Sequence, residues 1–177
     1  MNIYALSSGR GPSGIAIIRL SGKDTLKFSQ SISKKKYLKS KETNFCKFYN
    51  PSDNSLIDEG LLLWFPGPNS FTGEDLAEFH IHGSNAVITC FLKVLSNFED
   101  CRLAAPGEFT TIAFHNDKID LVEAESIGDL IHAETEIQRQ QAIKLVQGSA
   151  SNYYNDLRNK LIKSLAYIEA KIDFIED

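Results

Sequence analysis

The chain has 177 residues, 42% of them hydrophobic and 24% charged, so it has enough apolar material for one globular domain with or without an appendage. The formal net charge of −4 divides into +1 for residues 1–100 and −5 for residues 101–177, and the one basic cluster, at residues 34–41, is typical of a solvated loop, which disfavours tight nucleic-acid binding by this chain alone. Three scattered cysteines, no signal peptide and no apolar window near 18 residues exclude a disulfide framework and a membrane span, so we expect a cytoplasmic location.

Residues 1 to about 115 predict short strands separated by turns. The predicted strands cover residues 3–6, 14–20, 45–49, 61–65 and 76–82. The segment 61–65 is apolar throughout, which predicts a strand buried on both faces. The sequence G-R-G-P-S-G at residues 9–14 matches a dinucleotide-binding motif letter for letter, but a strand-like segment follows it where a helix is needed, so we expect a hairpin loop.

The strand at 76–82 alternates, with Ala77, Phe79 and Ile81 on one side and polar residues on the other. Glu78 on the polar side could accept two parallel hydrogen bonds from the edge of a flat heterocycle. His80 and His82 could share a metal, but no Cys or Asp completes a ligand set, so we expect them to line a pocket or join a hydrogen-bonded network.

Two helices are predicted in the first part of the chain, a short one starting at Asp24 and a longer one over residues 85–97, capped by Ser84 or Asn85. Cys90 lies in an apolar run, and we expect it in the core.

From about residue 117 the pattern is helical, with Asn116 or Asp117 as the cap and a break at Gly148. A helical stripe follows, consisting of Leu157, Leu161, Leu165, Ile168 and Ile172. A stripe of this length requires a partner surface, either in its own domain or in a bundle that is incomplete here.

Two cations complete the candidate site. Arg19 shares a strand face with Ile15 and Ile17, and its simplest role is to reach the sheet edge. Lys118 falls in the first turn of a predicted helix, where the helix dipole disfavours a cation, so its position needs another reason. With Glu78 they outline a site of one carboxylate and two cations.

The sequence resembles the MnmE (also called TrmE) family of tRNA modification GTPases. The segments that carry the resemblance are 9–22, 63–75, 105–110 and 116–125, in that order, and it continues through 147–148 to 172–174. The resemblance is weak from about residue 23 to residue 58. Ser84, Ile112 and His115 stand where the family usually has Gly, Arg and Leu.

The resemblance implies an α+β fold with a mixed β-sheet and packed helices, similar to the folate-binding fold of aminomethyltransferases. The domains implied are a tetrahydrofolate-binding and dimerisation domain at 1–117 and the first long helices of an incomplete helical domain at 118–177. No G-x-x-x-x-G-K-[ST] motif occurs, so we expect no GTP site of that kind in this chain and take it to be the front part of a longer protein.

Functionally, the resemblance implies that Arg19, Glu78 and Lys118 bind 5-formyl- or 5,10-methylene-tetrahydrofolate, with no metal and no catalytic residue in this chain. The full-length family member also uses GTP, Mg²⁺ and K⁺, and acts with the flavoprotein MnmG (GidA) on the wobble uridine of tRNA, giving a 5-carboxymethylaminomethyl-type modification. Whether this chain is itself an enzyme stays open. The alternatives are a stand-alone folate-dependent aminomethyltransferase-like enzyme and a ligand-free dimerisation scaffold.

Overall fold

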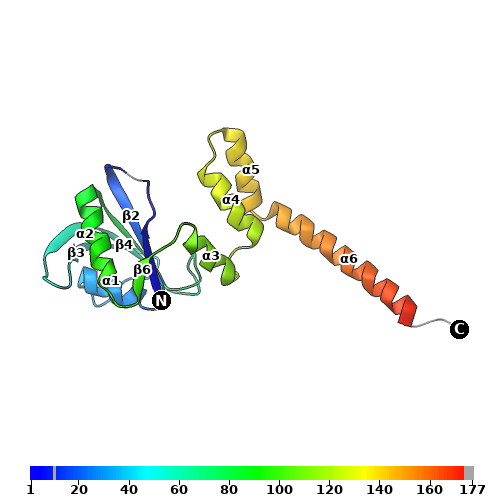
Figure 1. Cartoon of the computed structure of the whole chain (residues 1–177), viewed down its shortest axis with the longest axis horizontal. Coiled ribbons are helices and arrows are strands. Elements are labelled where there is room, and N and C mark those ends of the chain that lie inside the picture. The colour runs from blue at the N-terminus through cyan, green and yellow to red at the C-terminus, as the bar shows by residue number, and fades with distance from the viewer. Residues whose placement is uncertain (10, 174–177) are drawn as a thin grey trace. The chain divides into compact units, whose positions relative to one another are not determined.

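The computed structural model describes residues 1–9 and 11–173, in two compact units that meet between Lys118 and Ile119. Unit 1 holds a six-stranded sheet with the order β3-β4-β5-β2-β1-β6 and helices α1 to α3, and unit 2 holds helices α4 to α6 (Figure 1). The strands are β1 (Asn2–Leu6), β2 (Ser13–Ser21), β3 (Thr43–Tyr49), β4 (Leu56–Phe65), β5 (Leu76–Gly83) and β6 (Cys101–Leu103). The helices are α1 (Thr25–Ser33), α2 (Asn85–Ser96), α3 (Glu108–His115), α4 (Leu121–Ile131), α5 (Glu136–Val146) and α6 (Ser149–Asp173).

The predicted α+β class with a mixed sheet is confirmed. Strand β6 pairs with β1 in parallel, and the other neighbouring strands pair antiparallel. The segment after β1 leads directly into its antiparallel neighbour β2, and the Ser7 amide donates to the Ile17 carbonyl at 2.8 Å. The hairpin interpretation of residues 9–14 is therefore confirmed, although Arg10 lies outside the described residues.

The sheet has a covered face and an open face. On the covered face, alternate strand side chains form one core with apolar residues of α1 and α2, including the three rings of Phe48, Phe79 and Phe91. The alternation predicted for β5 is confirmed, since Ala77, Phe79 and Ile81 are all buried.

The open face carries the other side chains of each strand. It consists of Phe45, Leu61, Leu63, Ile15, Ile17, Arg19, Glu78 and His80, as the strand register shows. The prediction that residues 61–65 are buried on both faces is wrong, because Leu61 is 37% exposed while Leu62 and Trp64 are buried. The apolar run in β4 reflects an open face that is apolar, with α1 and α2 both on the other side.

Helix α2 begins as predicted, because Ser84 Oγ accepts a hydrogen bond from the Val87 amide at 3.2 Å. Ser84 is therefore the N-cap of α2. The placement of Cys90 in the core is wrong, since this α2 side chain is exposed. Asp24 precedes α1 as predicted, without a side-chain cap bond.

Unit 2 begins with a cap that differs from the prediction. Asp120, and neither Asn116 nor Asp117, caps α4, forming a capping box in which it exchanges hydrogen bonds with Glu123, each 2.8 Å long. The predicted helical pattern starts at about residue 117, so it did not indicate α3, which ends at His115.

Within unit 2, α4 and α5 pack together and bury the small residues Ser126 and Ala142. The predicted break at Gly148 is confirmed, since this residue has φ +78° and separates α5 from α6. The apolar stripe of α6 stays between 42% and 67% exposed, so it does not pack on its own unit. None of the described helices is long and apolar enough to cross a membrane.

Replacing Phe91 with Ala is expected to lower the free energy of unfolding by about 3–5 kcal/mol, because its ring is fully buried between α2 and the covered face. Urea unfolding followed by circular dichroism measures the change. The matched control is Phe45→Ala on the open face, where the ring is 61% exposed and the expected loss is below about 1 kcal/mol. Equal losses for the two variants would contradict the assignment of the faces.

Candidate functional site

Arg19 and Glu78 form an ion pair across two neighbouring strands on the open face. They are direct partners in the β2–β5 register, and the Arg19 Nε and Nη2 groups both donate to Glu78 Oε1, at 3.0 and 2.6 Å. The side chains are only 26% and 17% exposed. Strand β2 lies in the interior of the sheet, so the interpretation of Arg19 as reaching the sheet edge is wrong. Because both donors use Oε1, the carboxylate keeps Oε2 for another partner.

The Arg19 guanidinium is also held by two aromatic rings. Its central carbon lies 5.3 Å from the centroid of Phe71 and 5.5 Å from that of Phe109. Both distances suit a cation–π interaction. Phe71 belongs to the loop between β4 and β5, and Phe109 to the first turn of α3, so Arg19 ties three parts of unit 1 together.

Lys118 lies in a turn after α3, and the prediction that it occupies the first turn of a helix is wrong. Its backbone amide donates to the Ala113 carbonyl at 2.9 Å, and its Nζ donates to the Pro68 carbonyl at 2.9 Å. Its stem passes Gly73, where an added Cβ would sit 3.2 Å from Lys118 Cδ. Lys118 therefore does not meet an unfavourable helix dipole, because it lies outside the helices and is held by contacts with the β4–β5 loop.

The β4–β5 loop connects the three predicted site residues. Pro68 contacts Lys118, and Phe71 contacts Arg19, the partner of Glu78. The loop is anchored to β2 at its other end, where Ser21 Oγ lies 2.8 Å from Thr72 Oγ1 in a buried hydrogen bond. One loop thus brings Lys118 and the Arg19–Glu78 pair into the same part of unit 1.

Two histidines on the polar side of β5 have different surroundings. His82 is exposed, and its Nδ1 lies 2.8 Å from Asp58 Oδ1, while its amide donates to Asp58 Oδ2 at 2.7 Å. His80 lines an open-face cavity of about 150 Å³, and its Nε2 lies 3.9 Å from Glu78 Oε2. The prediction that these histidines line a pocket or join a hydrogen-bonded network is confirmed. In the described parts of the chain, no group of three or more His, Cys, Asp or Glu is placed to hold a metal.

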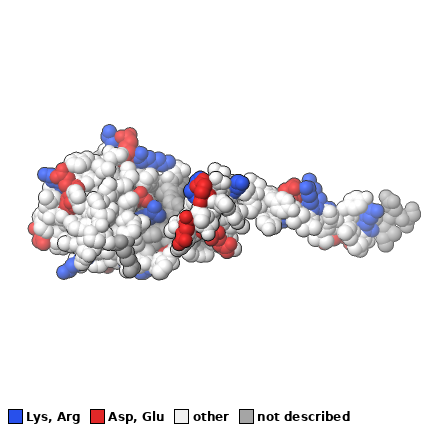
Figure 2. Space-filling model, turned by 90° about the horizontal axis from the view of Figure 1, so that it is seen from above, with Lys and Arg blue, Asp and Glu red and all other residues white. Residues whose placement is uncertain are grey.

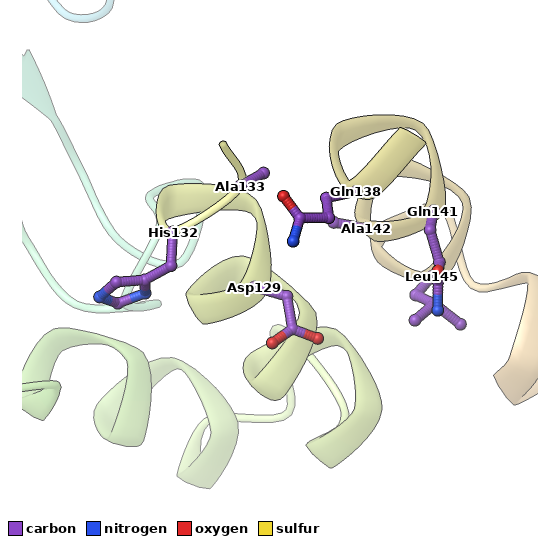
Figure 3. A pocket seen from close by; sticks show the side chains of 7 residues that line it. All are labelled: Asp129, His132, Ala133, Gln138, Gln141, Ala142 and Leu145. Atoms are coloured by element: carbon purple, nitrogen blue, oxygen red, sulfur yellow. The ribbon is translucent and has the colours of Figure 1, made fainter. Parts of the chain in front are cut away.

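A second cavity, of about 270 Å³, lies in unit 2 between α4 and α5 (Figure 3). Two of its polar residues are held by local bonds, since His132 Nδ1 lies 2.8 Å from the Gly128 carbonyl and Gln138 Oε1 accepts from the Thr135 amide at 2.9 Å. This cavity is larger, but its lining includes none of the predicted site residues, and we assign the candidate site to the open face of unit 1.

On the face drawn in Figure 2, the charges of the described residues give no separate indication of a nucleic-acid site. On the face that Figure 2 shows, the Lys and Arg side chains of the described residues are interspersed with Asp and Glu. A tight site for a phosphate backbone draws on clustered basic side chains.

Comparison with known proteins decides the family. Residues 2–118 match the family model described as "GTP-binding protein TrmE N-terminus", and residues 121–177 match the one described as "MnmE helical domain". The chain belongs to the MnmE/TrmE family. The GTPase named tRNA modification GTPase MnmE from Pelagibacter ubique is 55% identical over 177 residues, which are 100% of this chain and 40% of that protein.

Two mitochondrial proteins are also similar to this MnmE-family chain. The tRNA modification GTPase gtpbp3 of Dictyostelium discoideum is 46% identical, and the 5-taurinomethyluridine-[tRNA] synthase subunit GTPB3 of Danio rerio is 45% identical. In both cases the match covers 99% of this chain and 35% of the relative. The chain therefore spans about two fifths of the length of the curated relatives it matches, or less.

The start of α3, which carries Phe109, depends on a pair that sequence reasoning missed. Glu108 accepts hydrogen bonds from the Arg102 guanidinium, one of them 2.9 Å long, and from the Ala105 amide at 2.7 Å. These donors, the guanidinium first, lower the pKa of Glu108 from 4.5 to about 2. Arg102 and Glu108 lie six residues apart across a turn, so no helical or strand spacing indicated the pair.

Glu108→Gln is expected to lower the stability of the full chain at neutral pH and to have little effect at pH 2. The folded-state pKa is depressed, so the contribution of the carboxylate is fully present above pH 4.5 and is lost as the pH falls towards about 2. Thermal unfolding of wild type and variant at several pH values measures the difference. A difference that stayed constant from pH 7 to pH 2 would refute the role of the ionised pair.

Proposed function

We propose that this chain is the part of a tRNA modification GTPase that binds a reduced folate and forms a homodimer. The observation that supports the proposal best is the Arg19–Glu78 pair, in which Oε2 of a largely buried carboxylate remains for a ligand, near His80 and the mainly apolar cavity that His80 lines. A small set of fixed polar groups on an apolar surface is the usual form of a site for an organic cofactor.

The ligand chemistry fits the geometry of the carboxylate. The pterin ring of tetrahydrofolate presents N–H donors on one edge, and Glu78 Oε2 can only accept. Arg19 is engaged with Glu78 and the two aromatic rings, so its role is to orient the carboxylate. Lys118 Nζ donates to the neutral Pro68 carbonyl, which leaves its positive charge available to the anionic glutamate tail.

For the whole protein we propose GTP hydrolysis with Mg²⁺ and K⁺, and modification of the wobble uridine of tRNA together with the flavoprotein MnmG (GidA). The bound folate, as 5-formyl- or 5,10-methylene-tetrahydrofolate, is the proposed one-carbon donor. The names of the relatives support the tRNA-modifying activity. We also propose a cytoplasmic location, on the resemblance of the chain to bacterial tRNA modification GTPases.

Calorimetric titration with 5-formyltetrahydrofolate is expected to show binding by the chain, and Glu78→Gln is expected to weaken it at least about tenfold, because a charge-assisted hydrogen bond is lost. Glu42→Gln is the matched control, since Glu42 lies at the start of β3 in an exposed pair with Lys39. A folded wild-type chain that bound no folate would favour the ligand-free scaffold. An equal Kd for wild type and Glu78→Gln would show that the ligand binds away from Glu78.

Sedimentation equilibrium is expected to show a dimer. The open face exposes Ile15, Phe45 and Leu61, and burying such apolar surface favours association. Phe45→Asp is expected to weaken the dimer at least about tenfold if that ring enters the interface, whereas Tyr37→Asp, which changes another exposed aromatic residue, serves as the control. A wild-type chain that stayed monomeric at high micromolar concentration would contradict the proposal.

A further inference from the structure

His80 has a buried nitrogen with no hydrogen-bond partner. Its Nε2 atom is inaccessible to solvent, and no group of the described residues satisfies it. Glu78 Oε2 is the near polar atom, but their separation of 3.9 Å is too long for a hydrogen bond. A buried polar atom in this state destabilises the protein, so its presence requires an explanation.

The neighbouring histidine shows what a structural role looks like on the same strand. His82 lies two residues further along β5 on the same side, and its ring and amide are both bound to Asp58. His80 has no such fixed acceptor, although it is the less exposed of the two. The difference indicates that the partner of His80 is not supplied by the described part of this chain.

His80 connects the ion pair to the open-face cavity. Its register partners are Ile17 on β2 and Leu61 on β4, and the next residue on its side of β5 is Glu78. The cavity of about 150 Å³ beside it is lined by Gly14, Ile15, Glu59, Gly60, Leu61, Ile81 and His82. A planar ligand lying over Glu78 Oε2 would therefore continue over His80 into an apolar space.

The backbone of His80 is fixed from the side of β4. A Cβ at Gly60 would overlap the His80 carbonyl oxygen, so the two strands approach this closely only because position 60 is glycine. The strand thus fixes the backbone from which the His80 side chain projects, and rotation of the ring is the freedom that remains.

We propose that His80 is a specificity-determining residue of the folate site, and that its Nε2 forms a hydrogen bond with the polar ring edge of the pterin beside the N–H group that Glu78 Oε2 accepts. This inference rests on the proposed folate binding and adds a residue to it. Glu78 Oε2 accepts a hydrogen bond from an N–H group of the ring, and His80 Nε2 bonds to the polar atom next to that group. In the unliganded protein Nε2 is unsatisfied and closed to solvent, so the imidazole turns when the ligand binds and brings Nε2 to the ring edge.

The test compares three variants of the full chain by calorimetric titration with 5-formyltetrahydrofolate. His80→Leu, which has a similar volume and no polar atom, is expected to raise the Kd at least about tenfold. His80→Gln keeps a hydrogen-bonding group and is expected to stay within about threefold of wild type. His132→Gln in unit 2 is the control, since this histidine is bound to the Gly128 carbonyl outside the open-face cavity, and its Kd is expected to be unchanged.

Thermal unfolding without ligand separates a binding role from a structural one. His80→Leu removes an unsatisfied buried atom, so its Tm is expected to equal or exceed that of wild type. A lower Tm with an unchanged Kd would show a structural residue and overturn the inference. Independently of any variant, titration of folate into the wild-type chain is expected to shift the His80 Nε2 resonance in NMR spectra and to leave that of His132, in unit 2, in place.

The possible failures are distinguishable. If wild type and His80→Leu bind folate equally, or the His80 resonance does not move while folate binds, the inference about His80 is wrong and the proposed function stands. If the wild-type chain binds no folate, the proposed function fails, and the inference fails with it.

Discussion

The pairing of Arg19 with Glu78 is the constraint on which the rest of unit 1 depends. Two opposite charges stand at facing positions of adjacent strands, on a surface where each side chain is at least about three quarters buried. A largely buried charge destabilises the fold unless an opposite charge pairs with it, so the Arg19–Glu78 pair fixes the register of β2 and β5. A slip of β2 by one residue would turn Arg19 into the covered face, among the rings of Phe79 and Phe91, and would leave Glu78 without its partner.

The same pair organises the elements that surround it. The Arg19 guanidinium that pairs with Glu78 also contacts two aromatic rings, one from the β4–β5 loop and one from α3. The loop in turn accepts the Lys118 ammonium at Pro68. The register of β2 and β5, the position of the β4–β5 loop and the docking of α3 therefore all depend on Arg19. The same geometry leaves Glu78 Oε2 without a bond to Arg19.

Local sequence patterns predicted much of this fold, and their failures have identifiable causes. The period of two in β5 placed Glu78 and His80 correctly, because one buried face imposes strict alternation. The same reasoning failed for residues 61–65, because an apolar run does not reveal that one of its faces is uncovered. Lys118 was assigned to a helix because the reversal at Asp117, with φ +53°, has no strong local signal.

The site residues were indicated by resemblance, whereas their contacts were not. Arg19, Glu78 and Lys118 are far apart in the sequence, and only the strand order and the β4–β5 loop show how they meet. The contributions of Phe71 and Phe109 depend on the position of the guanidinium. The missing partner of His80 is a property of three neighbouring strands together, and no pattern along one strand contains it.

The first strand of the sheet has a consequence for how the protein is made. Strand β1 lies between β2 and β6, and the Asn2 side chain is fully buried, with its amide donating to the carbonyl of Asp100, 98 residues away. During synthesis β1 emerges about 95 residues before β6, and until β6 is made one edge of β1 stays unpaired. A tag fused ahead of Met1 would lie next to β6, the strand that completes the sheet, and would interfere with the pairing of β1 and β6.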